Sequence, residues 1–493
     1  YMLAYSWNVM WLDGVALLPL VVLGLEHMLH TGRFLPYALL LALALYANYY
    51  IGFMLCLFLV LYFLQWLLRQ PRSAGALTRA CGRFAGASLL AGGLAAFLLV
   101  PTALALSRTS AAGGTMPSFA SNFPLFELLG RMFYGASPTI RSGNLPNVYC
   151  GVIAVLLLPV SLCDRTVPLR RRLTEGGLLA VLALSCTVNQ WDLLWHGLHT
   201  PNDLPYRFSF LLCFAVLLVA GRALTRPRRV SVRALLASLA GCAAYLVLWE
   251  KLDGDDLTAE RLYGNLLLLA LYAALLLFTA RKKLPERIGQ RLAVILVAAE
   301  LLLSSGDALQ AMNRSEYFTN HENYVDNAAT AATDAALRRA EELAADEGLA
   351  FTRMEFLPRS TCMDTALQHY NGMTTFASSN PYGITKFMGQ LGYAVNGVNS
   401  YLYHSFAAAP DALFGIRYVV LEVRLTNHAQ LELVDSVSVG GATRYIYRNR
   451  LVLPVAYTAS EQALSYVGED YAPFRCQEQL YSALLGRSVT LYE

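Results

Sequence analysis

Arg207 is the residue whose type and position most directly suggest chemistry. It stands in the stretch PNDLPYRFSF, residues 201–210, and the apolar run that follows carries no charge until Arg222. An arginine keeps its proton and presents a planar fork of N–H groups, so Arg207 could hold an anionic headgroup at the membrane surface. His196 and His199 lie just before it, within reach of the same surface. The alternatives are a snorkelling arginine and solvated interfacial histidines.

Asp13 is the acidic candidate. The stretch WNVMWLDG, residues 7–14, places it in front of a long apolar run. A carboxylate there could act as a general base or as a metal ligand. It could equally be a helix N-cap, because an aspartate accepts a backbone N–H and suits the positive end of the helix dipole.

Amide and phenol groups form a third set, in the stretches ANYYIG, residues 47–52, and GNLPNVYCG, residues 143–151. Such groups could bind a sugar through hydrogen bonds and ring stacking, although aromatic residues also gather at membrane interfaces by default. With the polar residues of the Arg207 stretch added, the candidate sugar- or acceptor-binding residues are Asn48, Tyr49, Tyr50, Asn147, Tyr149, Asn202, Asp203 and Tyr206. Glu300 lies inside the last apolar run, where we expect it to bind across helices.

Other catalytic signatures are missing from the sequence. No P-loop, GxGxxG, GxSxG or HExxH string stands in a suitable fold context, so ATP hydrolysis, dinucleotide redox and serine-hydrolase chemistry are unsupported. The cysteines form no CxxC pair and no Cys/His cluster with zinc spacing. Cys362 and Cys476 lie in a polar region and could form one disulfide if that region is outside the cell.

The elements that carry these residues must be membrane helices. Hydrophobic residues make up 56% of the chain and charged residues only 15%, against roughly 25% charged residues in soluble proteins. This composition indicates an integral protein of a lipid bilayer. The net charge of +4 is spread over loops rather than gathered in a patch, so we expect no nucleic-acid partner.

Nearly charge-free runs recur along the first three hundred residues, and a helix needs about 20 of them to cross the hydrocarbon. The sequence predicts about 9–10 spans, near residues 14–29, 35–47, 51–67, 84–105, 148–163, 177–195, 207–223, 232–249, 262–280 and 291–305. The second and third are separate spans, because Asn48, Tyr49, Tyr50 and Gly52 interrupt an apolar stretch that is too long for one helix.

Arginine and lysine residues in the loops predict the orientation. They gather in alternate loops, around residues 69–83, 165–172, 222–233 and 281–291. By the positive-inside rule these loops face the cytoplasm. Residues 201–207 and everything after Ser305 should therefore face outward.

The composition changes after residue 305, which predicts two domains: a transmembrane helical domain at 1–305 and an extracytoplasmic domain at 306–493. The second has an alanine-rich amphipathic stretch at 327–348 and strand-like runs at 351–356, 416–423 and 443–449. We expect an α-helical integral membrane bundle followed by a mixed α/β domain.

Four segments in this order resemble the bacterial YfhO family of membrane proteins: WLDGVALLPLVVLGLE, NYYIGFMLCLFLVLYF, LPNVYCGVIAVLLLP and PNDLPYRFSFLLCF. The tail segments MTTFASSNPYGITKFMGQLGY and LFGIRYVVLE are similar to that family too. The resemblance implies a GT-C-like bundle that transfers a sugar from a polyprenyl-phosphate donor to a cell-envelope polymer such as lipoteichoic acid. Arg207, with His196, would bind the donor phosphate, Asp13 would be a secondary site acid, and a divalent metal stays open.

In GT-C enzymes the main acidic motif stands in the first outer loop. The chain begins at Tyr1 without a methionine, so we expect the main catalytic acid to lie upstream. The closing helix that the resemblance implies near the carboxyl end has no counterpart in the polar residues 460–493, so we expect the sequence to be truncated at both ends. Two other functions stay open: a transporter or flippase of a lipid-linked substrate, and a non-catalytic envelope scaffold. A transporter should show internal repeats and midplane charges, and no clear repeat is present in the sequence.

Overall fold

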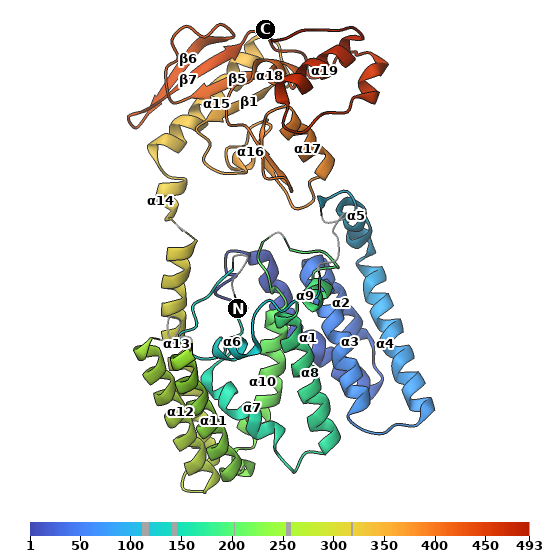
Figure 1. Cartoon of the computed structure of the whole chain (residues 1–493), viewed down its shortest axis with the longest axis vertical. Helices are drawn as coiled ribbons and strands as arrows, with labels where there is room; N and C mark the ends of the chain where they lie inside the picture. Colours follow the sequence, from blue (N-terminus) through green and yellow to red (C-terminus); the bar gives the residue numbers. More distant parts are fainter. Residues whose placement is uncertain (111–117, 141–144, 202, 253–257, 317–318, 493) are drawn as a thin grey trace. The chain divides into compact units, whose positions relative to one another are not determined.

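The computed structural model describes residues 1–110, 118–140, 145–201, 203–252, 258–316 and 319–492. The chain divides into two compact units, Tyr1–Val100 with Gly114–Phe318, and Pro101–Gly113 with Thr319–Glu493. Figure 1 labels most of the helices and the strands of the larger sheet. The domain boundary predicted at residue 305 stays a prediction.

The first unit is built of α-helices. The longer ones are α1 (Val9–Thr31), α3 (Tyr49–Leu68), α4 (Ala74–Leu94), α8 (Leu169–Thr187), α11 (Val232–Leu252), α12 (Ala259–Ala280) and α13 (Glu286–Ser315). The shorter ones are α2 (Leu35–Ala47), α6 (Leu125–Gly130), α7 (Val152–Leu162), α9 (Asn189–Trp195) and α10 (Ser209–Thr225), with the 3-10 helix η2 (Pro227–Arg229). Helix α5 (Ala96–Leu106) begins in the first unit, and its residues from Pro101 on belong to the second. Helix α1 packs on α2 and α3, α7 packs on α10 and α11, and α12 packs on α13. Their buried apolar side chains form one continuous core.

Five helices of the described chain are long and apolar enough to cross a membrane: α1, α3, α11, α12 and α13. A sixth is possible if α4 and α5, which meet at 77°, form one bent span. This corrects the larger number of spans predicted above. Helices α2, α7 and α10 have 13, 11 and 17 residues, fewer than the roughly 20 that a span needs, and α8 begins with the run Leu-Arg-Arg-Arg.

The predicted break between the second and third apolar segments is confirmed. Helix α2 ends at Ala47 and α3 begins at Tyr49, with Asn48 between them. The Oδ1 atom of Asn48 accepts a hydrogen bond from the Ile51 N–H at 2.9 Å, and its Nδ2 donates to the Met10 carbonyl at 3.1 Å. Asn48 is therefore the N-cap of α3 and ties that helix to α1.

Glu300 on α13 joins three elements, which confirms the prediction that it binds across helices. Its Oε1 accepts hydrogen bonds from the Tyr149 hydroxyl at 2.5 Å and from the Val152 N–H at 2.7 Å. Its Oε2 accepts one from the Tyr272 hydroxyl of α12 at 2.5 Å. A buried carboxylate with this many donors is well satisfied, so Glu300 acts as a structural link.

The second unit contains two sheets. The larger has the strand order β1 (Arg353–Leu357), β5 (Ile416–Leu421), β7 (Ala442–Asn449) and β6 (Leu431–Val439). Strands β1 and β5 are parallel, and the other neighbours are antiparallel. The smaller sheet has the order β2 (Thr375–Phe376), β4 (Ser400–Leu402) and β3 (Ala394–Val395). The helices are α14 (His321–Tyr324), α15 (Ala328–Asp346), α16 (Asp364–Leu367), α17 (Tyr382–Gln390), α18 (Ala408–Leu413), η3 (Glu461–Ser465) and α19 (Pro473–Leu485).

Both faces of the larger sheet are covered, because alternate side chains of a strand point to opposite faces. Tyr418 and Val420 of β5 belong to the cluster that contains buried residues of α15. Val419 and Leu421 belong to the cluster that contains buried residues of α17 and α19. The predicted mixed α/β composition is confirmed, including the alanine-rich helix and the three strand runs. Its placement outside the cell stays a prediction.

Cys362 and Cys476 do not form the disulfide considered above. Both thiols are free, Cys362 exposed and Cys476 buried. The Sγ atom of Cys476 donates to the Glu469 carbonyl at 3.0 Å. Cys476 is therefore a small core residue of the second unit.

Candidate functional site

Arg207 lies directly before α10, in a turn whose own carbonyl groups hold the guanidinium. Its Nε donates to the Leu204 carbonyl at 2.8 Å, and its Nη2 donates to the Asp203 carbonyl at 2.8 Å. These two bonds use only part of the donor set of a guanidinium. The side chain is thus fixed by its backbone while N–H groups remain for another acceptor.

The turn that carries Arg207 is strained. Leu204 and Tyr206 have φ values of 56° and 57°, in the left-handed region that favours glycine. Each such residue costs roughly 1–3 kcal/mol, and strain of this kind gathers at functional sites. The Tyr5 hydroxyl donates to the Pro205 carbonyl at 3.0 Å and so holds the turn from outside.

Two aromatic rings flank the guanidinium of Arg207. Its Cζ lies 5.0 Å from the ring centroid of Trp11 and 5.0 Å from that of Tyr50. Trp11 belongs to α1 and Tyr50 to α3. Cation–π contacts of this length are attractive and fix the plane of the guanidinium.

An acid and an imidazole lie near enough to this cation for its charge to act on both. Asp192 is in α9 and His196 follows that helix by one residue, one helical turn further along. The His196 Nδ1 donates to the Asp192 carbonyl at 2.9 Å and lies 3.4 Å from Asp192 Oδ1. The ring centroid of His196 is 6.3 Å from that of Tyr50. Asp192, His196, Arg207, Trp11 and Tyr50 are called the Arg207 cluster below.

The two titratable groups of the cluster are shifted in opposite directions. Burial raises the pKa of the Asp192 carboxyl to about 7, and the Arg207 guanidinium opposes that rise. Burial lowers the pKa of the His196 imidazole to about 3. The ring is therefore neutral near pH 7, so its contact with Asp192 is not an ion pair. Because Nδ1 donates, Nε2 carries the lone pair.

Three buried polar atoms of the cluster have no hydrogen-bond partner among the described residues. They are Asp192 Oδ1, His196 Nε2 and the Tyr50 hydroxyl. Buried polar atoms in proteins are nearly always hydrogen-bonded, so such exceptions need an explanation. A buried acid with a raised pKa beside a fixed cation is a candidate for chemistry.

The family model described as bacterial membrane protein YfhO matches residues 1–493 of the chain. The chain belongs to the YfhO family. The comparisons with curated proteins and with solved structures found no match. The resemblance noted in the sequence is thereby confirmed. This YfhO-family chain is a membrane protein with several apolar helices, and a lipid bilayer surrounds it.

Asp13 is not where the N-cap alternative placed it. Helix α1 begins at Val9 after the N-cap position Asn8, so Asp13 lies inside the helix and that alternative was wrong. Its side chain is exposed, and it makes no hydrogen bond or ion pair with the described residues. Its role as a site acid in this YfhO-family chain stays a prediction.

The candidate sugar-binding residues divide between several places. Asn48 is the N-cap described above, and Tyr149 donates to Glu300. Asn147 is buried and bonds in both directions with the backbone of Thr139, donating at 2.5 Å and accepting at 3.0 Å. Among the described members of this set, only Tyr50 contacts the Arg207 side chain through its own ring. A sugar-binding role for any of them stays a prediction.

The remaining candidates come from the turn before α10 and from the residue beside Tyr50. Tyr206 is buried with its ring centroid 5.7 Å from that of Phe123. Asp203 contributes its carbonyl to Arg207. Tyr49 is half-buried, with its ring centroid 6.4 Å from that of Tyr50. Asn202 lies outside the described residues.

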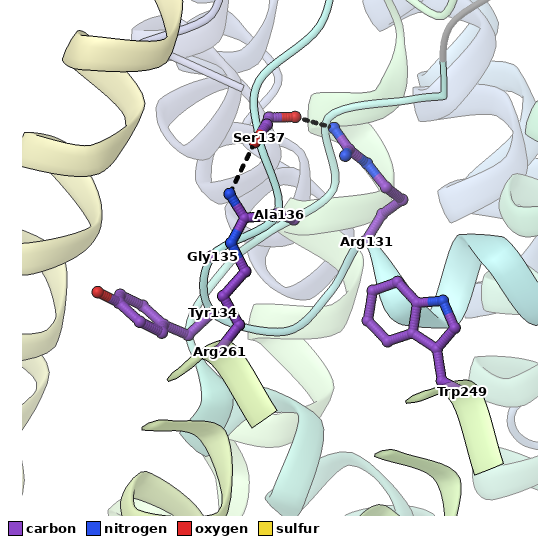
Figure 2. Close-up of a pocket in the computed structure, with 7 residues that line it drawn as sticks. All are labelled: Arg131, Tyr134, Gly135, Ala136, Ser137, Trp249 and Arg261. Carbon is purple, nitrogen blue, oxygen red and sulfur yellow. Dashed lines mark hydrogen bonds between the residues drawn. The ribbon is translucent and has the colours of Figure 1, made fainter. Parts of the chain in front are cut away.

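A second polar pocket in the first unit is structural. Figure 2 shows the side chains of Arg131 and Arg261 pointing toward Ser137. Arg131 donates to the Ser137 carbonyl, and Arg261 Nη2 donates to Ser137 Oγ at 3.1 Å. The space they enclose is about 20 Å³, room for about one water and no sugar phosphate. These arginines therefore fix the loop after α6.

Sequence reasoning missed Asp192 and Trp11. Asp192 was absorbed into the predicted span 177–195, whereas the structure ends α8 at Thr187 and starts the separate helix α9 at Asn189. The spacing of Asp192 and His196, four residues apart, was the available signal, since such residues share a helix face. Trp11 carried no such signal, because Trp11 and Arg207 are far apart in the sequence and meet only in the folded chain.

Proposed function

We propose that this YfhO-family protein is a membrane glycosyltransferase that moves a sugar from a polyprenyl-phosphate donor to a cell-envelope polymer such as lipoteichoic acid. The Arg207 cluster is the observation that carries the proposal. A permanent cation lies between two aromatic rings, beside a buried carboxyl whose pKa is raised to about 7. Phosphate binding, a stacking surface and a base are the groups that such a reaction needs.

Each group has a step in the proposed transfer. The acceptor hydroxyl forms a bond to the anomeric carbon of the sugar, and its proton passes to Asp192. The bond between that carbon and the phosphate oxygen breaks, and its electron pair leaves with the polyprenyl phosphate. Arg207 stabilises the negative charge that grows on the phosphate. Asp192 suits the role of base because a pKa of about 7 leaves much of it ionised at neutral pH.

His196 takes a different part from the one expected from sequence. A phosphate ligand must donate or carry positive charge, whereas the neutral His196 has already used its Nδ1–H on the Asp192 carbonyl. We assign it to positioning residue 192 itself, through the bond from its Nδ1–H to the Asp192 carbonyl. Asp13, exposed on α1 two residues after Trp11, remains a proposed secondary acid.

The cluster does not fit a divalent metal. It offers one carboxylate and one imidazole, and the described chain holds no group of three or more His, Cys, Asp or Glu side chains placed for an ion. Mg²⁺ and Ca²⁺ prefer sites with several oxygen ligands. The proposed steps therefore use only the side chains of the chain itself.

The donor-binding role is tested by transfer kinetics with a polyprenyl-phosphate sugar and a teichoic-acid acceptor. Arg207→Gln should lower kcat/KM at least about tenfold, a loss of about 1.4 kcal/mol of transition-state stabilisation. Arg207→Lys keeps the positive charge, so its kcat/KM should lie between those of Arg207→Gln and wild type. Arg226→Gln is the matched control, since Arg226 is an exposed arginine outside the cluster. Failure of the folded wild type to transfer from several donors would overturn the proposal and favour transport or scaffolding.

A further inference from the structure

A second hollow in the first unit has no part in the proposed transfer. It measures about 190 Å³ and lies between the end of α1, the end of α3 and the start of α4. Met28 and Trp66 form its apolar wall, and Arg72, Arg79 and Arg83 form its basic wall. A ligand of this cavity would have to accept hydrogen bonds from three arginines and carry negative charge.

The three arginines are brought together by the start of α4. Arg79 and Arg83 are four residues apart on that helix, so they share one face. Arg72 stands just before the N-cap Ser73. The guanidinium of Arg83 lies against the carboxyl-terminal end of α1, where a Cβ on Gly32 would come within 2.9 Å of Arg83 Nη1.

Arg72 is held in place with a donor to spare. Its Cζ lies 3.6 Å from the ring centroid of Trp66, and its Nη1 donates to the Trp66 and Leu67 carbonyls at 2.9 Å each. Its Nη2 is buried and has no hydrogen-bond partner among the described residues. A buried donor left unpaired is destabilising, so an acceptor in the cavity would be stabilised.

The described residues leave these three charges without acidic partners. None of Arg72, Arg79 and Arg83 forms an ion pair there. The nearby carboxylate of Glu26 is already engaged, since it accepts from Tyr62 at 2.8 Å and lies 3.3 Å from Arg69 Nη2. Like charges around one cavity repel each other unless an anion joins them.

We propose that this cavity binds a phosphate group, that of an anionic membrane-lipid headgroup. Arginine forks fit phosphate oxygens, and the unpaired Nη2 of Arg72 supplies a fixed donor. The segment that carries these arginines, within residues 69–83, is predicted to face the cytoplasm, where anionic lipids attract basic pockets. The proposal is independent of the transferase reaction, because it uses different residues.

The test measures binding of short-chain phosphatidylglycerol to the purified full chain, with phosphatidylcholine of the same chain length as the neutral comparison. The double variant Arg79→Gln/Arg83→Gln should weaken phosphatidylglycerol binding at least about tenfold. The matched control is Arg287→Gln/Arg291→Gln, which removes two exposed arginines of the same spacing from α13 and should stay within about twofold. Arg72→Lys keeps the charge but loses the planar fork. Its loss of phosphatidylglycerol binding should therefore lie between the losses of the two double variants.

The outcomes separate the explanations. Equal weakening by both double variants would show a general charge effect and overturn the site, as would equal binding of the two lipids by wild type. Competition by sn-glycerol 3-phosphate as strong as by the lipid would support a phosphate site and assign it to a soluble phosphate. Weak competition by that probe, with tight lipid binding, would support the headgroup.

Discussion

The hydroxyl of Tyr272 donates to Oε2 of Glu300 at 2.5 Å, from one candidate membrane helix to the next. Glu300→Ala removes this acceptor and leaves the donors of Tyr149, Tyr272 and Val152 unpaired in a buried place. We expect the variant to lose stability, by about 1–3 kcal/mol for each donor that stays unpaired. Thermal unfolding in detergent measures the loss.

Glu341→Ala is the control for that variant, since Glu341 is exposed and unpaired within the described chain. Glu300→Gln keeps an acceptor oxygen and should lose less than Glu300→Ala. If Glu300→Ala unfolded at the same temperature as the control, the proposed link between α12 and α13 would not contribute to stability.

The N-cap of α3 gives a second prediction. Asn48→Ala removes the acceptor for the Ile51 N–H and the donor to the Met10 carbonyl. Loss of a cap costs typically about 1 kcal/mol, so the unfolding temperature should fall, and Asn48→Ser should restore most of it. A variant that keeps its stability but loses sugar transfer would instead support the sugar-binding role predicted from the sequence.

Asp411 gives a pH dependence in the second unit. Its Oδ2 accepts from the Tyr403 hydroxyl at 2.8 Å and its Oδ1 from the Tyr393 hydroxyl at 3.0 Å, yet burial raises the pKa of this carboxyl to about 7. The folded pKa exceeds the unfolded one, so the stabilisation is complete below about pH 4 and is lost as the pH rises through about 7.

Asp411→Asn should therefore gain stability relative to wild type as the pH rises from about 5 to about 8, because the variant has no charge to bury. The difference between their unfolding temperatures, measured across this range, checks the sign. Asp346→Asn, at an exposed aspartate of α15, should show no such trend. A constant difference for Asp411→Asn would contradict the raised pKa.

Sequence patterns over a few residues predicted one helix break in the first unit and three strands in the second. The break at Asn48 followed from polar residues inside an apolar run, and the strands near Arg353, Ile416 and Thr443 followed from their composition. Strand β6 was missed, because its sequence LELVDSVSV mixes acidic and apolar residues on an edge strand. Hydrophobicity also overstated the number of spans, since it does not show where a helix ends.

Only part of the candidate site could be predicted from the sequence, because local patterns do not show where helices end or how they pack. Arg207 was evident from its own sequence neighbours, whereas Asp192 was hidden in an apolar run that the fold divides at Val188. The contact of Arg207 with Trp11 depends on how α1 packs, which no local pattern encodes. Long-range packing, not composition, brings the cluster together.

The pH profile of sugar transfer by wild type and Asp192→Asn tests the central claim most directly. If Asp192 takes the acceptor proton, wild-type kcat/KM should rise with pH and level off above about 7, the pKa to which burial raises this carboxyl. Asp192→Asn should lose at least about a hundredfold in kcat, with donor KM nearly unchanged and no such pH dependence. A folded Asp192→Asn variant with wild-type kcat and the wild-type pH profile would contradict the account.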